Sequence, residues 1–198
     1  MTIKAKTGMK NRMLISCLLL LTILLSACQM NHDNRDHEDA KDKNENLLEG
    51  TNEEFDGEFT IKAASSGLME VELGKLAVKQ GQFPDVKDIG HVMIKEHGAA
   101  NQELKSLAKS KNIGIPVTMS TVHQESVNRL TSKTGRGFDM DYLNLMVSAH
   151  EDDIRLFKEE TEKGGDADLK QWAQGKLPVL EHHLKMVEEA RSALKNRK

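Results

Sequence analysis

The stretch that decides the fold is Pro84–Ala108, PDVKDIGHVMIKEHGAANQELKSLA. Its apolar residues recur every three or four positions, which places them on one side of an α-helix: Val86, Ile89, Met93, Ala100, Leu104 and Ala108. His97 lies within this apolar side, whereas His91 falls on the opposite, charged side. The stretch therefore predicts an amphipathic helix that carries a titratable, metal-capable ring on its buried face.

Three further segments, 59–81, 138–163 and 167–194, show the same helical periodicity. Short glycine-containing breaks join the first helix to Pro84–Ala108 and the last two to each other, so we expect two antiparallel hairpins. The longer connection between the hairpins has a weak periodicity that predicts a short helix at 120–132. Aromatic residues make up 4% of the chain, which does not favour strands. We therefore expect an all-α fold, a four-helix bundle of the one-crossover, ferritin-like kind.

The N-terminal segment has the pattern of a bacterial export signal, with basic residues before the apolar run MLISCLLLLTILLSA. The run ends in Leu25-Ser26-Ala27-Cys28, which resembles the lipobox of bacterial lipoproteins. We therefore expect residues 1–27 to be a lipoprotein signal peptide and Cys28 to be lipidated. The alternative is a plain signal peptide with an incidental cysteine. The expected location is extracytoplasmic and membrane-anchored, on the periplasmic face of the outer membrane if the organism is Gram-negative.

Residues 28–57 are polar, of mixed charge and nearly free of aliphatic side chains. Such a segment cannot bury enough apolar surface to offset the entropy of ordering, so we expect a disordered tether there. The folded bundle is then expected at 58–198. The formal net charge of -3 argues against a nucleic-acid partner, which would need a basic face.

Each long helix is expected to place one polar, metal-capable residue inward: Glu72, His97, His150 and His183, with Asp153 as a fifth. On the helical wheel Glu72 falls on the apolar side of its helix, while Glu70 points away. Neutral imidazoles with a carboxylate suit Zn(II), Cu(II) or Fe(II). The open alternative is a metal-free polar network, in which the carboxylates pair with the histidines.

Four segments are similar to the DUF4142 family of exported bacterial proteins: AASSGLMEVELGKLAV, PDVKDIGHVMIKEHGAANQEL, GFDMDYLNLMVSAHEDDIRLFKEE and LKQWAQGKLPVLEHHLKM. The more specific pieces are Glu72-Leu73-Gly74, His97 with Asn101, Phe138-Asp139 with Tyr142 and His150, and Leu177-Pro178 followed by His183. The resemblance covers about residues 59–190 and implies a ferritin-like bundle of unestablished function. The chain departs from the family pattern at Glu96, where the family usually has Asp.

The resemblance does not supply a reaction. Ferritin-like di-iron proteins carry Glu three residues before a ligand His on two helices, but this chain has Ile94 and Leu180 there. Any metal site is therefore expected to be mononuclear or built differently from a ferritin-type di-iron centre. We expect an envelope-anchored bundle that binds a transition metal in metal or stress handling, without a turnover reaction. The alternative is a structural or interaction bundle, for which the sequence names no protein partner. A third possibility, an oxidase or hydrolase, has no nucleophile motif or cofactor loop in its favour.

Overall fold

The computed structural model describes residues 35–49, 51 and 53–197. Within these residues every regular element is a helix, which confirms the all-α prediction. Residues 35–48 are helical, and the later helices follow in the order α2 Glu54–Gln80, α3 Pro84–Ser110, α4 Thr121–Thr131, α5 Gly135–Lys163 and α6 Ala167–Asn196. The expected signal peptide and the lipobox cysteine, Cys28, lie outside the described residues.

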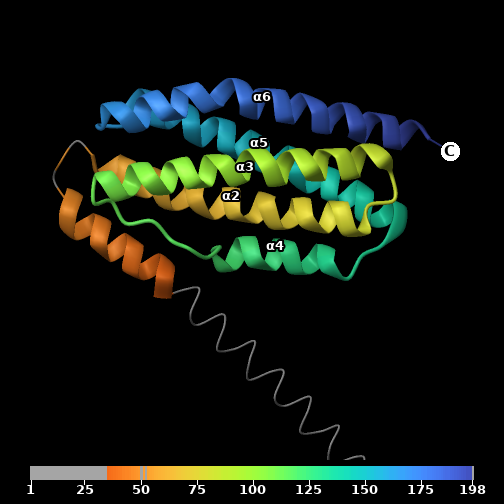
Figure 1. Cartoon of the computed structure of the whole chain (residues 1–198), viewed down its shortest axis with the longest axis horizontal. Coiled ribbons are helices and arrows are strands. Elements are labelled where there is room, and N and C mark those ends of the chain that lie inside the picture. The colour runs from red at the N-terminus through yellow and green to blue at the C-terminus, as the bar shows by residue number, and fades with distance from the viewer. Residues whose placement is uncertain (1–34, 50, 52, 198) are drawn as a thin grey trace, which may run out of the picture.

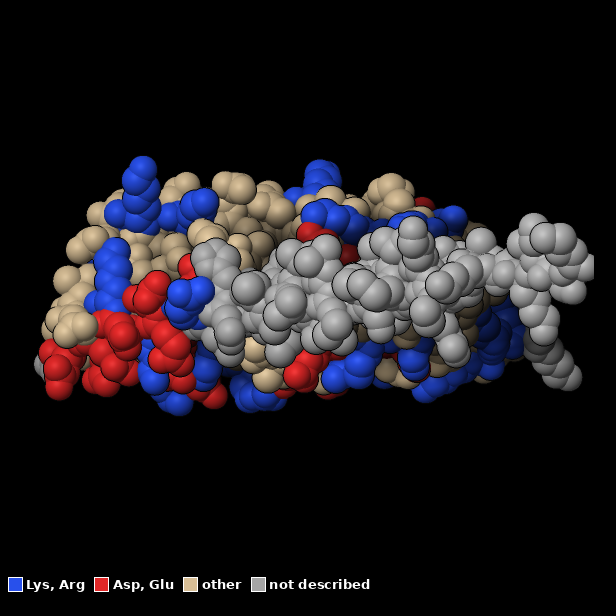
Figure 2. All heavy atoms as spheres, turned by 90° about the horizontal axis from the view of Figure 1, so that it is seen from below, with Lys and Arg blue, Asp and Glu red and all other residues tan. Residues whose placement is uncertain are grey.

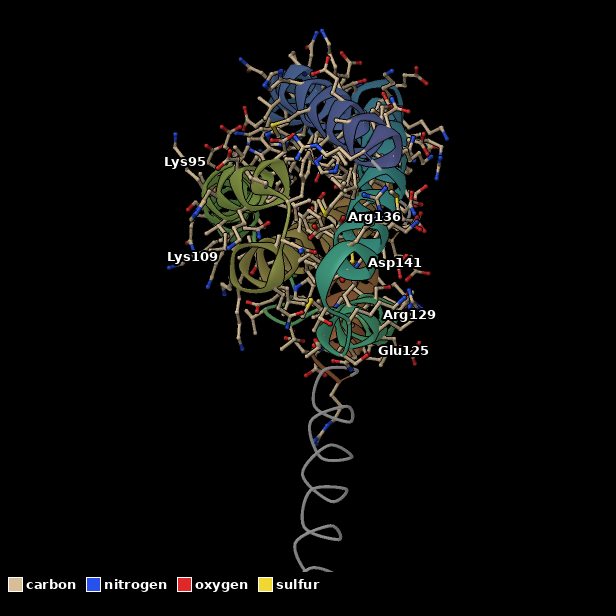
Figure 3. All side chains as sticks on the ribbon, turned by 90° about the vertical axis from the view of Figure 1, so that its right-hand side faces the viewer. Lys95, Lys109, Glu125, Arg129, Arg136 and Asp141 are labelled. Carbon is tan, nitrogen blue, oxygen red and sulfur yellow. The ribbon has the colours of Figure 1, made fainter. Side chains whose placement is uncertain are left out.

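The long helices form two hairpins that pack into one bundle (Figure 1). α2 pairs with α3, α5 pairs with α6, and α2 lies along α5 to join the hairpins. The short helix α4 lies in the crossover, against α2, as the sequence predicted. A view along the bundle shows Lys95 and Lys109 on the outer side of α3, with α6 above it (Figure 3). α3 and α6 contact each other the least of the neighbouring pairs of long helices, so the seam between them is the loosest side of the bundle.

Each hairpin turn is closed by an aspartate from the other hairpin. Asp139, near the start of α5, accepts hydrogen bonds from the backbone N–H groups of Gln82 and Phe83. Asp56, near the start of α2, does the same at the turn before α6. Because the first N–H groups of a helix lack intrahelical partners, these carboxylates satisfy donors that would otherwise be unpaired.

The expected disordered tether differs from the structure over residues 35–48. This stretch packs as a helix against the domain, where Ala40 and Leu48 are buried. Asn44 donates from Nδ2 to the carbonyl oxygens of Gly57 (3.2 Å) and Gly114 (3.0 Å). The composition suggested disorder because the segment has few aliphatic residues. A few buried contacts are enough here, since the amide of Asn44 also satisfies backbone groups of the neighbouring elements.

The surface carries charges of both signs. Figure 2 shows acidic side chains gathered at one end of one face, with lysine and arginine side chains spread along it. Among the described residues, no helix is both long enough and apolar enough to cross a bilayer.

Candidate metal centre

A polar layer divides the hydrophobic core of the bundle into two clusters. On α3, Met93 belongs to one cluster and Leu104 to the other, and His97 lies between them. On α5, His150 and Asp153 lie between the two clusters, and on α6 His183 does. On α2 the change of cluster falls between Ala64 and Met69, next to the buried Glu70. The bundle therefore gathers its buried histidines at a single level.

The three histidines form a nearly equilateral triangle. The ring centroids of His97, His150 and His183 are separated by 5.2 to 5.4 Å. The rings are buried, and one ligand-capable nitrogen from each lies within 4.8 Å of the others. The sequence predicted all three as inward-facing, and the structure brings them together.

One nitrogen of each ring has an acceptor beside it. His97 Nδ1 lies 2.6 Å from Glu70 Oε2, a close polar contact whose geometry is not that of a hydrogen bond. His150 Nδ1 lies 2.9 Å from the carbonyl oxygen of Met146. His183 Nε2 lies 2.9 Å from Glu96 Oε2. The Met146 carbonyl and the Glu96 carboxylate fix the tautomers of neutral His150 and His183, because the nitrogen beside an acceptor carries the proton. The same holds for His97 when Glu70 is ionised.

The other nitrogen of each ring therefore carries a lone pair. These atoms are His97 Nε2, His150 Nε2 and His183 Nδ1. His97 Nε2 and His183 Nδ1 are 3.2 Å apart, and when Glu70 is ionised and takes the Nδ1 proton of His97 as its partner, these two nitrogens cannot hydrogen-bond to each other. His150 Nε2 is buried and has no hydrogen-bond partner among the described residues. Three converging lone pairs form the donor set that a transition-metal ion needs.

Burial keeps the three rings neutral. It lowers the pKa of His97 to about 4, an effect that the charges of Asp153 and Glu96 oppose. Burial also lowers the pKa values of His150 and His183. Metal binding requires the neutral form, so no proton has to be displaced from the facing nitrogens at neutral pH.

Two carboxyl groups lie beside the histidines. The pKa of Glu70 is raised to about 7. Burial is the largest cause, and it is partly offset by the electrostatic interaction with His150 and by a hydrogen bond with Asp153, which both lower the pKa. Burial raises the pKa of Asp153 well above its ordinary value, and the charge of Glu70 raises it further. Two adjacent buried carboxyl groups resist ionising together, so the pair holds a proton more readily than either group would in water.

The acidic member from α2 is Glu70, which corrects the prediction of Glu72. Glu70 is fully buried, whereas the side chain of Glu72 is 43% exposed and pairs with Lys75 on the surface. The helical wheel was oriented on large apolar residues of α2 that are only partly buried: Ile61, Leu68 and Leu76. The buried face of α2 is instead rich in small residues, which the apolar pattern does not reveal: Ala63, Ala64, Ser66, Gly67, Gly74 and Ala77.

A cavity of about 190 Å³ opens beside the triangle, in the loose seam between α3 and α6. His97 and His183 line it together with the carboxyl groups of Glu70 and Asp153. Asn101, one turn after His97, also lines the cavity. A Cβ on Gly67 would lie 2.2 Å from Asn101 Oδ1, so the missing side chain at Gly67 makes room for this amide.

A family model described as a domain of unknown function, DUF4142, matches residues 38–190. The chain belongs to the DUF4142 family. The match confirms the resemblance noted in the sequence and extends it toward the N-terminus, into the helical residues 35–48. No curated protein and no solved structure matches the chain.

Two residues of this DUF4142 site were not predicted as site residues. Glu70 was placed on the wrong face, and Glu96 was noted only as a departure from the family pattern. Glu96 is adjacent to His97 in the chain but accepts from His183 across the α3–α6 seam. Helical spacing does not show this contact, because it depends on how closely the two helices approach.

Proposed function

We propose that this protein binds one transition-metal ion through His97 Nε2, His150 Nε2 and His183 Nδ1. The proposal rests on how the two nitrogens of each ring are placed. One nitrogen lies beside an acceptor, and the other faces the centre of the histidine triangle. Histidine ligands in metal sites commonly donate their second N–H to a carboxylate or carbonyl oxygen, which orients the ring. Imidazole ligands suit Zn(II), Cu(II) and Fe(II).

The competing hypothesis is a metal-free polar network that only fixes the packing of the helices. In that network His150 Nε2 stays without a partner and two lone pairs oppose each other between His97 and His183, both of which are costly in a buried site. A protonated Glu70 that donates to His97 Nδ1 would let His97 Nε2 donate to His183 Nδ1 and so relieve the second problem, but His150 Nε2 would still have no partner. A bound cation satisfies all three nitrogens, so the observations favour the metal.

The biological setting follows from the sequence and is part of the proposal. A lipidated Cys28 would anchor the protein to a membrane outside the cytoplasm. The order hairpin, crossover, hairpin supports a ferritin-like bundle. We propose that the bundle handles or senses metal or stress at the cell envelope without turnover, and the alternative is an interaction bundle.

Metal titration of the purified full chain tests the proposal. We expect one equivalent of Zn(II), Cu(II) or Co(II) to bind tightly, measured by elemental analysis after gel filtration and by competition with a chromophoric chelator. His97→Ala and His150→Ala should each abolish stoichiometric binding. His91→Ala is the matched control, because His91 is exposed on the same helix as His97. The proposal fails if the parent retains no metal, or if the site variants bind as well as the control.

A further inference from the structure

The cavity between α3 and α6 provides a route to the histidine triangle. This inference rests on the proposed metal site. A metal held by three histidines keeps a coordination position open for another ligand. Two of the three ligand histidines, His97 and His183, line the cavity directly. A small molecule in the cavity would therefore meet the metal.

The walls of the cavity away from the histidines are largely apolar. Leu104, Phe157, Trp172 and Leu180 line it, along with the small residues Ala63 and Ala100. Its volume of about 190 Å³ is somewhat larger than the roughly 150 Å³ dry cavity that accommodates benzene. A ligand with a ring-sized apolar body would thus fill it.

The polar end of the cavity carries groups of both signs. Three neutral imidazoles bring no negative charge to a divalent ion, and a carboxylate is a usual ligand for such ions. Glu70 and Asp153 line the cavity but resist ionising together, and Glu96 is occupied by His183, so the coordination position itself is left to a bound ligand. Lys176 also lines the cavity, and its Nζ forms an ion pair with Glu103 Oε2 at 2.6 Å. The Asn101 amide makes no hydrogen bond with other described residues and lines the same cavity. It offers a donor and an acceptor to a bound molecule.

We propose that the cavity binds a small monocarboxylate with a ring-sized apolar body, whose carboxylate completes the coordination of the metal. The apolar body would pack against Leu104, Phe157 and Trp172. Benzoate is the probe that combines these features. Acetate has the carboxylate without the body, and benzyl alcohol has the body without the charge.

Trp172 is the single tryptophan of the chain, so its fluorescence reports on the cavity without interference. We expect benzoate to change Trp172 fluorescence in the metal-loaded full chain with saturation in the millimolar range or below. Acetate and benzyl alcohol should bind at least about tenfold more weakly. In the Co(II)-loaded protein, benzoate should also change the visible absorption bands, which report on coordination of the metal.

A cavity-filling variant separates binding in the cavity from binding elsewhere. Ala100→Phe should weaken benzoate at least about tenfold while metal stoichiometry stays at one. Lys95→Phe is the matched control, because it adds the same side chain on the outer side of α3 (Figure 3). Unchanged benzoate binding in Ala100→Phe would place the ligand outside the cavity and overturn the inference.

Failure of this inference is distinguishable from failure of the metal site. If metal binds but benzoate alters neither fluorescence nor Co(II) absorption, the inference is wrong and the metal site stands. If metal-free protein binds benzoate as tightly as loaded protein, coordination by the carboxylate is wrong. If no metal is retained, the proposed function fails and this inference fails with it.

Discussion

Asp56 and Asp139 close the two hairpin turns of the bundle in the same way. Asp139 Oδ2 accepts from the backbone N–H of Phe83 at 2.8 Å, and Asp56 Oδ2 accepts from the N–H of Asp166 at 2.9 Å. Each also accepts from the preceding residue of the turn. Each aspartate belongs to the first helix of the opposite hairpin, so the two hairpins hold each other's turns.

This equivalence continues toward the centre of the bundle. Glu70 follows Asp56 at the same spacing at which Asp153 follows Asp139. The turn glycines Gly81 and Gly164 also follow the two aspartates at equal spacing. The adjacent carboxyl groups beside the histidines are therefore one contribution from each hairpin, at equivalent positions. The histidines do not obey this equivalence, since α2 contributes none of the three.

The turn aspartates should contribute measurably to stability. Asp139→Ala leaves the backbone N–H groups of Gln82 and Phe83, in the turn before α3, without their acceptor. We expect a loss of about 1–3 kcal/mol in the free energy of unfolding, measured by urea denaturation. Asp141→Ala is the control, because Asp141 lies on the same helix but is exposed and pairs with Lys133 at the surface. Its effect should stay below about 1 kcal/mol. Equal losses in the two variants would contradict the role given to Asp139.

The buried Glu160 should make stability fall as pH rises. Its pKa is raised from 4.5 to about 9, mainly by burial and also by the hydrogen bond with Asp56. Neither carboxyl oxygen of Glu160 has a donor among the described residues, so the protonated acid, which can donate to Asp56, is the satisfied form. Above pH 4.5 the folded state binds a proton that the unfolded state has released. The contribution of the Glu160 proton to the free energy of unfolding is therefore fully present below about pH 4.5 and is lost as the pH rises toward 9.

Glu160→Gln tests this dependence, because the amide keeps the shape and the donor without titrating. Between pH 5 and 8 we expect the parent to lose on the order of 3 kcal/mol more than the variant, measured by denaturation at each pH. Glu159→Gln is the control, because Glu159 is adjacent, 40% exposed and paired with Lys163. Identical pH profiles for the parent and Glu160→Gln would rule out a buried proton at this position.

The apolar periodicity predicted the all-α fold, the four long helices and the short helix of the crossover. It succeeded because three of the long helices bury large side chains at regular spacing, such as Ile89 of α3, Met146 of α5 and Val187 of α6. It placed His97, His150 and His183 correctly for the same reason, since each lies within such a stripe.

The periodicity failed on α2, because this helix packs through small residues. Gly74 and Gly90 show how close α2 and α3 approach: a Cβ on either would lie 2.7 or 2.8 Å from the carbonyl oxygen of the other. A helix face that packs closely through glycine and alanine has few large apolar side chains, so the apolar periodicity does not mark it as the buried face. The wheel consequently selected Glu72 instead of Glu70.

The close approach of α2 and α3 should not tolerate a methyl group. Gly90→Ala would bring its Cβ within 2.7 Å of the Gly74 carbonyl oxygen and 2.9 Å of the Ala77 Cβ, so the helices must separate. We expect a loss of about 1–3 kcal/mol in the free energy of unfolding. Gly175→Ala, in α6, meets nothing within 4 Å and should stabilise by about 0.5–1 kcal/mol, because alanine favours the helix. Thermal or urea denaturation compares the two, and a stabilising Gly90→Ala would contradict the packing.

Glu70 is the buried carboxyl group beside two of the proposed ligand histidines, and its substitution tests whether it supports metal binding. Glu70 Oε2 lies 2.6 Å from His97 Nδ1 and Oε1 lies 3.3 Å from His150 Nδ1, so one side chain orients two ligand rings. Glu70→Gln keeps the volume but removes the negative charge and one acceptor oxygen. We expect Zn(II) affinity to fall by about 10–100-fold, the usual effect of removing such a supporting contact.

Glu72→Gln is the matched control for this prediction. Glu72 lies two residues away on the same helix, and it faces the surface beside Lys75. The affinity of this variant for Zn(II), measured by chelator competition, should equal that of the parent. A loss in Glu72→Gln with none in Glu70→Gln would restore the assignment made from the helical wheel. Equal affinities in all three proteins would mean that the ligand rings keep their orientation without the carboxylate, and that the packing of α3 and α5 holds them.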